Sequence, residues 1–268
     1  MPVPAEKRAD NLTVIILAAG LSSRMGGKKK EFLKLNDNLT VLGSSVNTFL
    51  SFPEIQSIII VVSAGEEAAA RDALPAKVFE SGKNIEFVTG GNSRRASVFN
   101  ALSFLERHIE DTCCLKDACH LKDSCCSNYA LIHDGARPWV SASLVANIIT
   151  AVKKYGAVIP LLTLTDTPKE CDAQINIEAS DESKPVLIKT HLKRAYTGIA
   201  QTPQAFKFPD ILYAHQKAAQ TKFAQTPFAQ IDEDFTDDAE VWGKFCGQVA
   251  VIKGEQENKK ITFPEDLK

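Results

Sequence analysis

Short apolar segments alternate with segments of helical periodicity along most of this 268-residue chain. A buried strand needs about four to eight apolar or β-branched residues, whereas the residues on one face of a helix recur about every three or four positions. Their alternation predicts a Rossmann-like α/β fold, in which right-handed crossovers place helices on both faces of a mostly parallel sheet. The predicted strands are residues 14–17, 58–62, 85–88, 129–132, 157–160 and 249–252, and the predicted helices are 41–49, 98–105, 144–152 and a region after 209.

Two segments interrupt this alternation. Residues 164–193 are polar and rich in Thr, Asp and Lys, which predicts a β-arm that protrudes from the sheet. Residues 108–128 separate a predicted helix from a predicted strand, a connection that usually takes about two to six residues. We interpret them as an insert, and we expect a single domain over residues 1–268 that carries both segments.

The charge balance is nearly even, with 31 Lys and Arg against 33 Asp and Glu and a formal net charge of −2. This balance excludes the overall basic field that non-specific nucleic-acid binding requires. The apolar segments are far shorter than the roughly 18 residues of a membrane-spanning helix. Residues 1–11 are polar and lack the apolar stretch of a secretory signal. We therefore expect a cytoplasmic protein with neither nucleic-acid nor membrane partners.

The predicted insert is rich in cysteine. It holds five of the seven cysteines of the chain. Together with His120 they could supply thiolate and imidazole ligands for Zn²⁺, but their spacing does not follow a paired C-x-x-C scheme. The sequence therefore favours a thiol-bearing, solvent-exposed insert over a Zn²⁺ site. The five residues are Cys113, Cys114, Cys119, Cys125 and Cys126.

The segment that follows the first predicted strand has the composition of a phosphate-binding loop. Residues 17–30 read LAAGLSSRMGGKKK, so small residues allow the backbone to approach a ligand, and Arg24 and Lys30 supply positive charge. The pattern is neither G-x-x-x-x-G-K-[ST] nor G-x-G-x-x-G, which argues against a P-loop ATPase or an ordinary dinucleotide site. Taken alone, the loop could also be a flexible basic surface segment.

Two further motifs follow predicted strands. In residues 90–98, GGNSRRASV, the glycines allow close packing against a flat base, Asn92 or Ser97 could bond its edge, and Ser93 could simply cap the next helix. In residues 133–138, HDGARP, Asp134 is placed to hold a Mg²⁺ that bridges phosphates, since Mg²⁺ prefers hard oxygen ligands. A single Asp at a strand end could instead be a helix cap.

Together these motifs closely resemble the 2-C-methyl-D-erythritol 4-phosphate cytidylyltransferases of isoprenoid biosynthesis. Their order and approximate spacing agree with that family from about Val14 to Leu267. The matching residues are Ala18-Ala19-Gly20 through Arg24 and Lys30, Gly90-Gly91 with Arg94 and Ser97, residues 133–138, Thr202-Pro203-Gln204, and Lys260-Ile261-Thr262 followed by residues 264–267.

The resemblance implies a Mg²⁺-dependent nucleotidyltransferase that moves CMP from CTP to the phosphate of 2-C-methyl-D-erythritol 4-phosphate and releases pyrophosphate. The phosphate oxygen of the substrate is already a nucleophile, so catalysis consists of positioning and charge neutralisation. A cytidylyltransferase for ribitol 5-phosphate shares the nucleotide motifs and is the alternative within this reaction class. A non-catalytic nucleotide-binding or metal-binding protein is the alternative outside it, although Lys30, Asp134 and Lys260 argue against it.

The resemblance also assigns roles to individual residues. It implies that Arg24, Lys30 and Lys260 act on the phosphates of CTP and that Asp134 lies beside the Mg²⁺. The nucleotide would be held by Ala18, Ala19, Gly20, Gly91, Asn92 and Ser97. In this family an arm crosses to the partner subunit of a homodimer, which implies that Thr167 and Arg194, with Arg137 nearby, bind the sugar phosphate.

The chain departs from the family pattern at two places. It has Lys29-Lys30-Glu31 where the family usually has Pro-Lys-Gln, and Asn92 where an Asp is usual. Loss of the proline is expected to loosen the loop, and Glu31 places a negative charge near phosphate. Asn92 keeps the capacity for hydrogen bonds without the charge.

Overall fold

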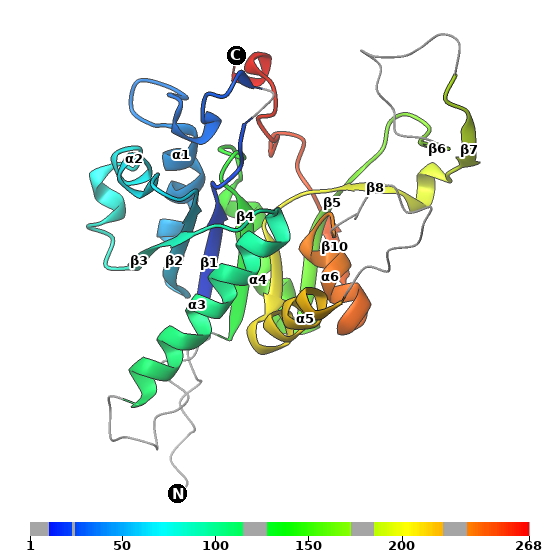
Figure 1. Cartoon of the computed structure of the whole chain (residues 1–268). Helices are drawn as coiled ribbons and strands as arrows, with labels where there is room; N and C mark the ends of the chain where they lie inside the picture. The colour runs from blue at the N-terminus through cyan, green and yellow to red at the C-terminus, as the bar shows by residue number, and fades with distance from the viewer. Residues whose placement is uncertain (1–10, 23–24, 115–127, 173–184, 222–234, 268) are drawn as a thin grey trace, which may run out of the picture.

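The computed structural model describes residues 11–22, 25–114, 128–172, 185–221 and 235–267 (Figure 1). Its centre is an eight-stranded sheet in the order β10-β5-β9-β4-β1-β2-β3, with β8 paired to β5. The strands are β1 (Leu12–Leu17), β2 (Ile55–Val62), β3 (Asn84–Thr89), β4 (Tyr129–Asp134), β5 (Ala157–Thr163), β8 (Gly198–Ala200), β9 (Gln204–Lys207) and β10 (Ala250–Lys253).

The predicted mostly parallel sheet is confirmed. β1 pairs in parallel with β2 and β4, β2 with β3, and β10 with β5. Strand β9 lies antiparallel between β4 and β5, and β8 is antiparallel to β5. Every predicted strand is present, whereas β8, of three residues, and β9, of four, were not predicted.

Helices cover both faces of the sheet, as predicted (Figure 1). On β1, Val14 and Ile16 point to one face and Ile15 to the other, which is the period of two expected for a strand buried on both sides. The first face is covered by α1 (Val41–Asn47), α2 (Glu67–Asp72) and α4 (Ala142–Tyr155), with the 3-10 turns η3 (Thr48–Ser51) and η4 (Ala76–Val78). The second face is covered by α3 (Arg94–Cys114), α5 (Phe208–Gln220) and α6 (Asp238–Phe245).

Local capping sets the ends of several helices. The side chains of Thr40, Ser141 and Asp237 accept hydrogen bonds from backbone N–H groups in the first turns of α1, α4 and α6. Gly156 ends α4 in the left-handed conformation, with φ of 79°. These short polar signals fix where each crossover helix starts relative to the strand before it.

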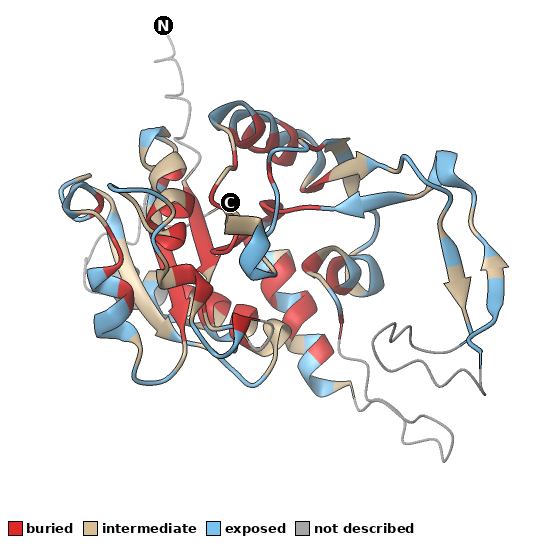
Figure 2. Ribbon diagram, turned by 90° about the horizontal axis from the view of Figure 1, so that it is seen from above, coloured by how far each residue is buried: buried red, intermediate tan, exposed pale blue. Residues whose placement is uncertain are grey.

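The predicted β-arm is also present. Strands β6 (Lys169–Cys171) and β7 (Ile188–His191) form a separate antiparallel pair that lies away from the main sheet (Figure 1). Buried residues are concentrated in the central sheet and the helices packed on it, whereas the arm is exposed or half-buried (Figure 2). Residues 173–184, between the two arm strands, lie outside the described residues.

Helix α3 extends to Cys114, so the first residues of the insert predicted at 108–128 are helical. The remaining cysteines of the cluster, together with His120, lie outside the described residues, so both the thiol-bearing insert and its Zn²⁺ alternative stay predictions. The single domain over 1–268 likewise stays a prediction. In the part of the chain that is described, no helix is both long and apolar enough to cross a membrane.

Candidate active site

A cleft of about 660 Å³ opens at the carboxyl ends of β1, β3 and β4. Carboxyl ends of parallel strands share one edge of a sheet, which is where such folds bind ligands. The loop after β1, the glycine turn before α3, the end of β4 and the C-terminal segment all contribute to this cleft. Of the predicted site residues, Ala19, Gly20, Lys30, Gly91, Asn92, Ser97, Asp134 and Lys260 line it.

The loop after β1 carries a lysine into the cleft. Ala18, the first residue of the loop, is fully buried, and its N–H donates to the Val61 carbonyl at 2.8 Å. The loop then turns back through η2 (Lys30–Phe32). There the Lys30 ammonium donates to the Ile261 carbonyl at 2.8 Å. Lys30 is thus fixed at the cleft, and Arg24 lies outside the described residues.

The turn before α3 requires both of its glycines. A Cβ at Gly90 would lie 2.6 Å from the Ala19 Cβ, and one at Gly91 would lie 2.5 Å from the Ala96 Cβ. The Ser97 hydroxyl accepts from the Gly91 N–H at 3.0 Å and donates to the Ser93 carbonyl at 2.9 Å. Ser97 therefore shapes the turn, and its predicted contact with the nucleotide would be made from that position.

Asp134, at the end of β4, is surrounded by cations. Its Oδ2 lies 2.9 Å from the Lys260 ammonium and 3.3 Å from Arg137 Nε, and its Oδ1 lies 3.9 Å from Arg94 Nε. Burial raises the pKa of Asp134, but the charges of Lys260, Arg94 and Arg137 outweigh burial and hold it well below its usual range. The carboxylate is therefore ionised at the cleft.

His133 holds the end of β4 in place and is not a catalytic base. Its Nε2 lies 3.2 Å from the Arg137 carbonyl, and its Nδ1 lies 3.1 Å from the Thr202 hydroxyl. Because a carbonyl only accepts, we assign the proton to Nε2, so that Thr202 donates to Nδ1. Burial lowers the pKa of His133 to about 4, so the ring is neutral. The Thr202 oxygen in turn accepts from the Asp134 N–H at 3.0 Å.

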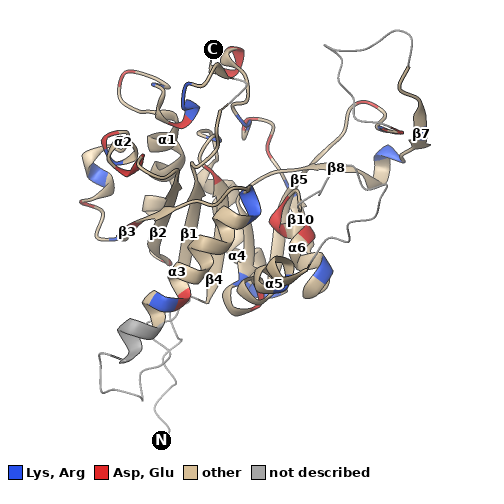
Figure 3. Ribbon diagram, viewed as in Figure 1, with Lys and Arg blue, Asp and Glu red and all other residues tan. Residues whose placement is uncertain are grey.

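The C-terminal segment is bound across the ends of β4 and β9. The Asn258 carboxamide donates to the Thr202 carbonyl at 2.8 Å, and the Asn258 carbonyl accepts from Arg137 at 2.8 Å. The Ile261 N–H donates to the Ala136 carbonyl at 2.9 Å. These bonds explain how Lys260, far along the chain, reaches Asp134. Figure 3 shows the positive charge of the loop after β1 close to this segment.

The sequence did not reveal the buried carboxylate that pairs with Arg94. Its guanidinium lies 2.8 Å from Asp238, whose other oxygen lies 3.3 Å from His215 Nε2. Asp238 and His215 are fully buried. Burial lowers the pKa of Arg94, but Asp238 and Asp134 outweigh burial and raise it, so the guanidinium stays charged. Nothing in the local sequence around Asp238 indicates this pair, because its two members lie on different helices.

A comparison with protein-family models shows which family this chain belongs to. The model described as 2-C-methyl-D-erythritol 4-phosphate cytidylyltransferase matches residues 12–268. The chain belongs to the 2-C-methyl-D-erythritol 4-phosphate cytidylyltransferase family. It is therefore a cytidylyltransferase of isoprenoid biosynthesis, as the motifs predicted.

Individual relatives agree with this membership. A 2-C-methyl-D-erythritol 4-phosphate cytidylyltransferase from Desulforamulus reducens is 31% identical over 259 residues, which cover 96% of this chain and 93% of the relative. One from Bacillus thuringiensis is 30% identical over 256 residues, which cover 95% and 94%. The crystal structure of 4-diphosphocytidyl-2C-methyl-D-erythritol synthase from Anaerococcus prevotii has a TM-score of 0.69 and 27% identity, covering 97% of this chain and 93% of that one.

The residues predicted for the sugar phosphate are divided between two places. Arg137 lies beside the cleft, bound to Asp134 and to the Asn258 carbonyl. Thr167 and Arg194 are exposed near the base of the arm, where Arg194 donates to the Thr165 carbonyl. Neither of these two residues lines the cleft of its own chain.

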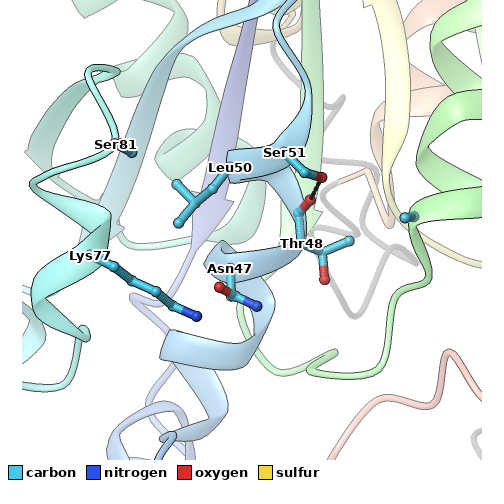
Figure 4. A pocket seen from close by; sticks show the side chains of 7 residues that line it. Asn47, Thr48, Leu50, Ser51, Lys77 and Ser81 are labelled. Carbon is cyan, nitrogen blue, oxygen red and sulfur yellow. Dashed lines mark hydrogen bonds between the residues drawn. The ribbon is translucent and has the colours of Figure 1, made fainter.

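A second hollow of about 520 Å³ lies away from this cytidylyltransferase cleft (Figure 4). Among the described residues that line it, Lys77 is the only charged one, and none of them lines the cleft. Its lining residues are Asn47, Thr48, Leu50, Ser51, Lys77, Ser81 and Ala142.

Proposed function

We propose that this cytidylyltransferase takes CTP and 2-C-methyl-D-erythritol 4-phosphate as its substrates and forms 4-diphosphocytidyl-2-C-methyl-D-erythritol and pyrophosphate. The observation that carries the proposal is the convergence of Lys30, Lys260 and an ionised Asp134 in one cleft. The family resemblance directs these lysines at the α-phosphate of CTP, and a protein that only bound nucleotide would not need positive charge there.

The reaction needs orientation rather than a general base. A phosphate oxygen of the sugar phosphate attacks the α-phosphorus of CTP, and the bond from that phosphorus to the oxygen of the β-phosphate breaks. Negative charge grows on the α-phosphate oxygens and on the departing pyrophosphate. Lys30 enters the cleft from the loop after β1 and Lys260 from the C-terminal segment, so together with Arg24 they would neutralise this charge.

The residues present fit a Mg²⁺ that arrives with CTP. Mg²⁺ is usually bound by one or two carboxylates together with substrate phosphates and water. Asp134 supplies one ionised carboxylate, whose Oδ2 lies 2.9 Å from the Lys260 ammonium and whose Oδ1 lies 3.9 Å from Arg94 Nε. No cluster of three or more His, Cys, Asp or Glu side chains is placed for a metal among those residues. Asp134 would thus hold the cation only jointly with the phosphates, whose charge the Mg²⁺ would reduce.

A homodimer completes the proposed site. The arm and its base expose apolar side chains, with Leu187 60%, Ile188 53% and Tyr196 88% exposed. Apolar surface of this kind on an isolated arm suits burial against a second copy of the chain. Thr167 and Arg194 would then reach the partner subunit's cleft and bind the phosphate of its sugar.

The experiment is an assay of pyrophosphate release from CTP and Mg²⁺, with 2-C-methyl-D-erythritol 4-phosphate and ribitol 5-phosphate tested in parallel. We expect turnover with the first substrate and little with the second. Preference for ribitol 5-phosphate would reassign the acceptor and keep the mechanism. Absence of turnover with both would overturn the proposal in favour of a protein that only binds nucleotide.

A further inference from the structure

Lys29 ties the nucleotide loop to the neighbouring strand. Its ammonium donates to the Gly20 carbonyl at 2.9 Å and to the Ser63 hydroxyl at 2.7 Å, and it lies 2.7 Å from Glu66 Oε2. Gly20 belongs to the loop after β1, whereas Ser63 and Glu66 belong to the turn after β2. An ammonium has three hydrogens. These three contacts use all of them, so Lys29 has no donor left for a phosphate while they persist.

The partners of Lys29 form a connected set. The Ser63 hydroxyl, which accepts from Lys29, donates to the Ala19 carbonyl at 3.2 Å. Glu66 Oε2 is buried, and Lys29 is its partner in the described part of the chain. Two successive carbonyls of the loop are therefore held in place. The Ala19 carbonyl accepts from Ser63, and the Gly20 carbonyl accepts from Lys29, which is itself bound to Ser63 and Glu66. We call Lys29, Ser63 and Glu66 the loop clamp.

Holding these two carbonyls also orients two donors. In a trans peptide the carbonyl of one residue and the N–H of the next point in opposite directions. The clamp therefore fixes the N–H groups of Gly20 and Leu21, two residues that line the cleft. Neither N–H donates a hydrogen bond within the described residues. Oriented backbone N–H groups of this kind bind phosphate oxygens.

The loop benefits from such a constraint because several of its described residues adopt left-handed backbone conformations. Ser22 has φ of 50°, which is uncommon for a residue with a side chain, and Gly26 and Gly27 follow with φ of 64° and 80°. Fixing a flexible loop when the nucleotide binds would cost affinity. A clamp that is already formed in the free enzyme removes part of that cost.

We infer that Lys29 is a positioning residue for CTP: it fixes the loop from Ala19 to Leu21 for the triphosphate and does not itself bind the nucleotide. This inference rests on the proposed function, since it takes CTP as the ligand of the cleft. Lys29 occupies the position where the family usually has proline, and its φ of −63° is the angle that a proline ring imposes. The clamp thus supplies through a side chain the restraint that proline supplies through its ring.

Three variants test this role by steady-state kinetics and CTP titration calorimetry. Lys29→Ala is expected to raise the KM and Kd for CTP about tenfold, with little change in kcat or in the KM for the sugar phosphate. Lys29→Pro should recover most of the loss, because the φ angle already fits and the Lys29 N–H donates no hydrogen bond within the described residues. Lys28→Ala is the matched control, because Lys28 is an exposed neighbour of equal charge. Equal losses in the alanine variants at 28 and 29, or no recovery with proline, would overturn the inference.

Glu66→Gln separates positioning from direct binding by the sign of its effect. If Lys29 acts through the clamp, the variant weakens CTP binding, and adding it to Lys29→Ala causes no further loss. If Lys29 instead moves onto the phosphates, removing its carboxylate partner leaves CTP binding unchanged or tighter, and the inference fails. Calorimetry keeps this test independent of turnover, so a wild-type enzyme that binds CTP without reacting would overturn the proposed function alone.

Discussion

Glu31 is a buried carboxyl at the edge of a site for phosphates. It is 3% exposed and lies 3.4 Å from the Ser22 hydroxyl. Burial raises its pKa from 4.5, although its own backbone N–H and the charges of Lys30 and Lys29 act in the opposite direction. Its contribution to folding is therefore complete below the unfolded pKa and is lost as the pH rises through the folded pKa. Above its folded pKa, the charge of Glu31 both destabilises the fold and repels the triphosphate.

Glu31→Gln should consequently stabilise the protein in a pH-dependent way. Glutamine keeps an acceptor for Ser22 and removes the charge. We expect the free energy of unfolding to rise by about 1 kcal/mol at pH 8 and by much less at pH 4, with a lower KM for CTP at pH 8. Urea denaturation at the two pH values measures the difference. A gain of equal size at both pH values would show that the charge of Glu31 is not the cause.

Lys260 tests charge neutralisation at a single residue. Its side chain is 41% exposed, and its ammonium lies 2.9 Å from Asp134. By analogy with the loss of one oxyanion donor, Lys260→Ala should cost about 3 kcal/mol of transition-state stabilisation, seen mainly in kcat. The exposed neighbour Lys259 provides the control variant, Lys259→Ala. A kcat equal to that of the wild type at saturating substrates would remove Lys260 from the mechanism.

At the scale of elements, the sequence predicted the functional motifs that lie at the carboxyl ends of the strands. The loop after β1, the glycine turn after β3 and Asp134 at the end of β4 each adjoin a strand whose apolar pattern is plain. Strand β9 reads QAFK and lacks the apolar, β-branched run that marked β10, AVIK, although both strands have four residues. The contacts that hold the elements together, such as Arg94 with Asp238 or Asn258 with Thr202, join segments distant in sequence. Pattern along the chain cannot reveal them.

Helix α6 depends on one of those contacts. Asp238 is fully buried between Arg94 and His215, so its removal leaves two buried polar groups without their partner. Asp238→Asn is expected to lower the free energy of unfolding by about 3 kcal/mol, the usual cost of breaking a buried ion pair. Its neighbour Asp237, the N-cap of α6, offers the comparison Asp237→Ser, which keeps a capping oxygen. Urea denaturation should show a much lower free energy of unfolding for Asp238→Asn than for Asp237→Ser. Similar values would contradict a stabilising role for the contacts of Asp238 with Arg94 and His215.

At the scale of the whole molecule, the cleft and the arm lie in different places in one chain. Lys30, Lys260 and Asp134 meet in the cleft, whereas Thr167 and Arg194 are exposed near the arm and do not line it. Sequence motifs could identify both groups of residues through the family resemblance. They could not show that a single chain leaves the groups apart, because this depends on the direction in which the arm leaves the sheet.

This separation makes subunit complementation a direct test of the proposed dimer. Lys260→Ala damages the cleft and Arg194→Ala damages the arm, so neither homodimer turns over well at low sugar phosphate. If the arm serves the partner's cleft, a mixed dimer has one site with both defects and one intact site. Random exchange at equal amounts should then restore about a quarter of wild-type activity, because half the dimers are mixed and each has one working site of two. Activity is measured after the two variants are unfolded together and refolded. A mixture no more active than its parents would mean that the arm serves its own chain or does not bind the sugar phosphate.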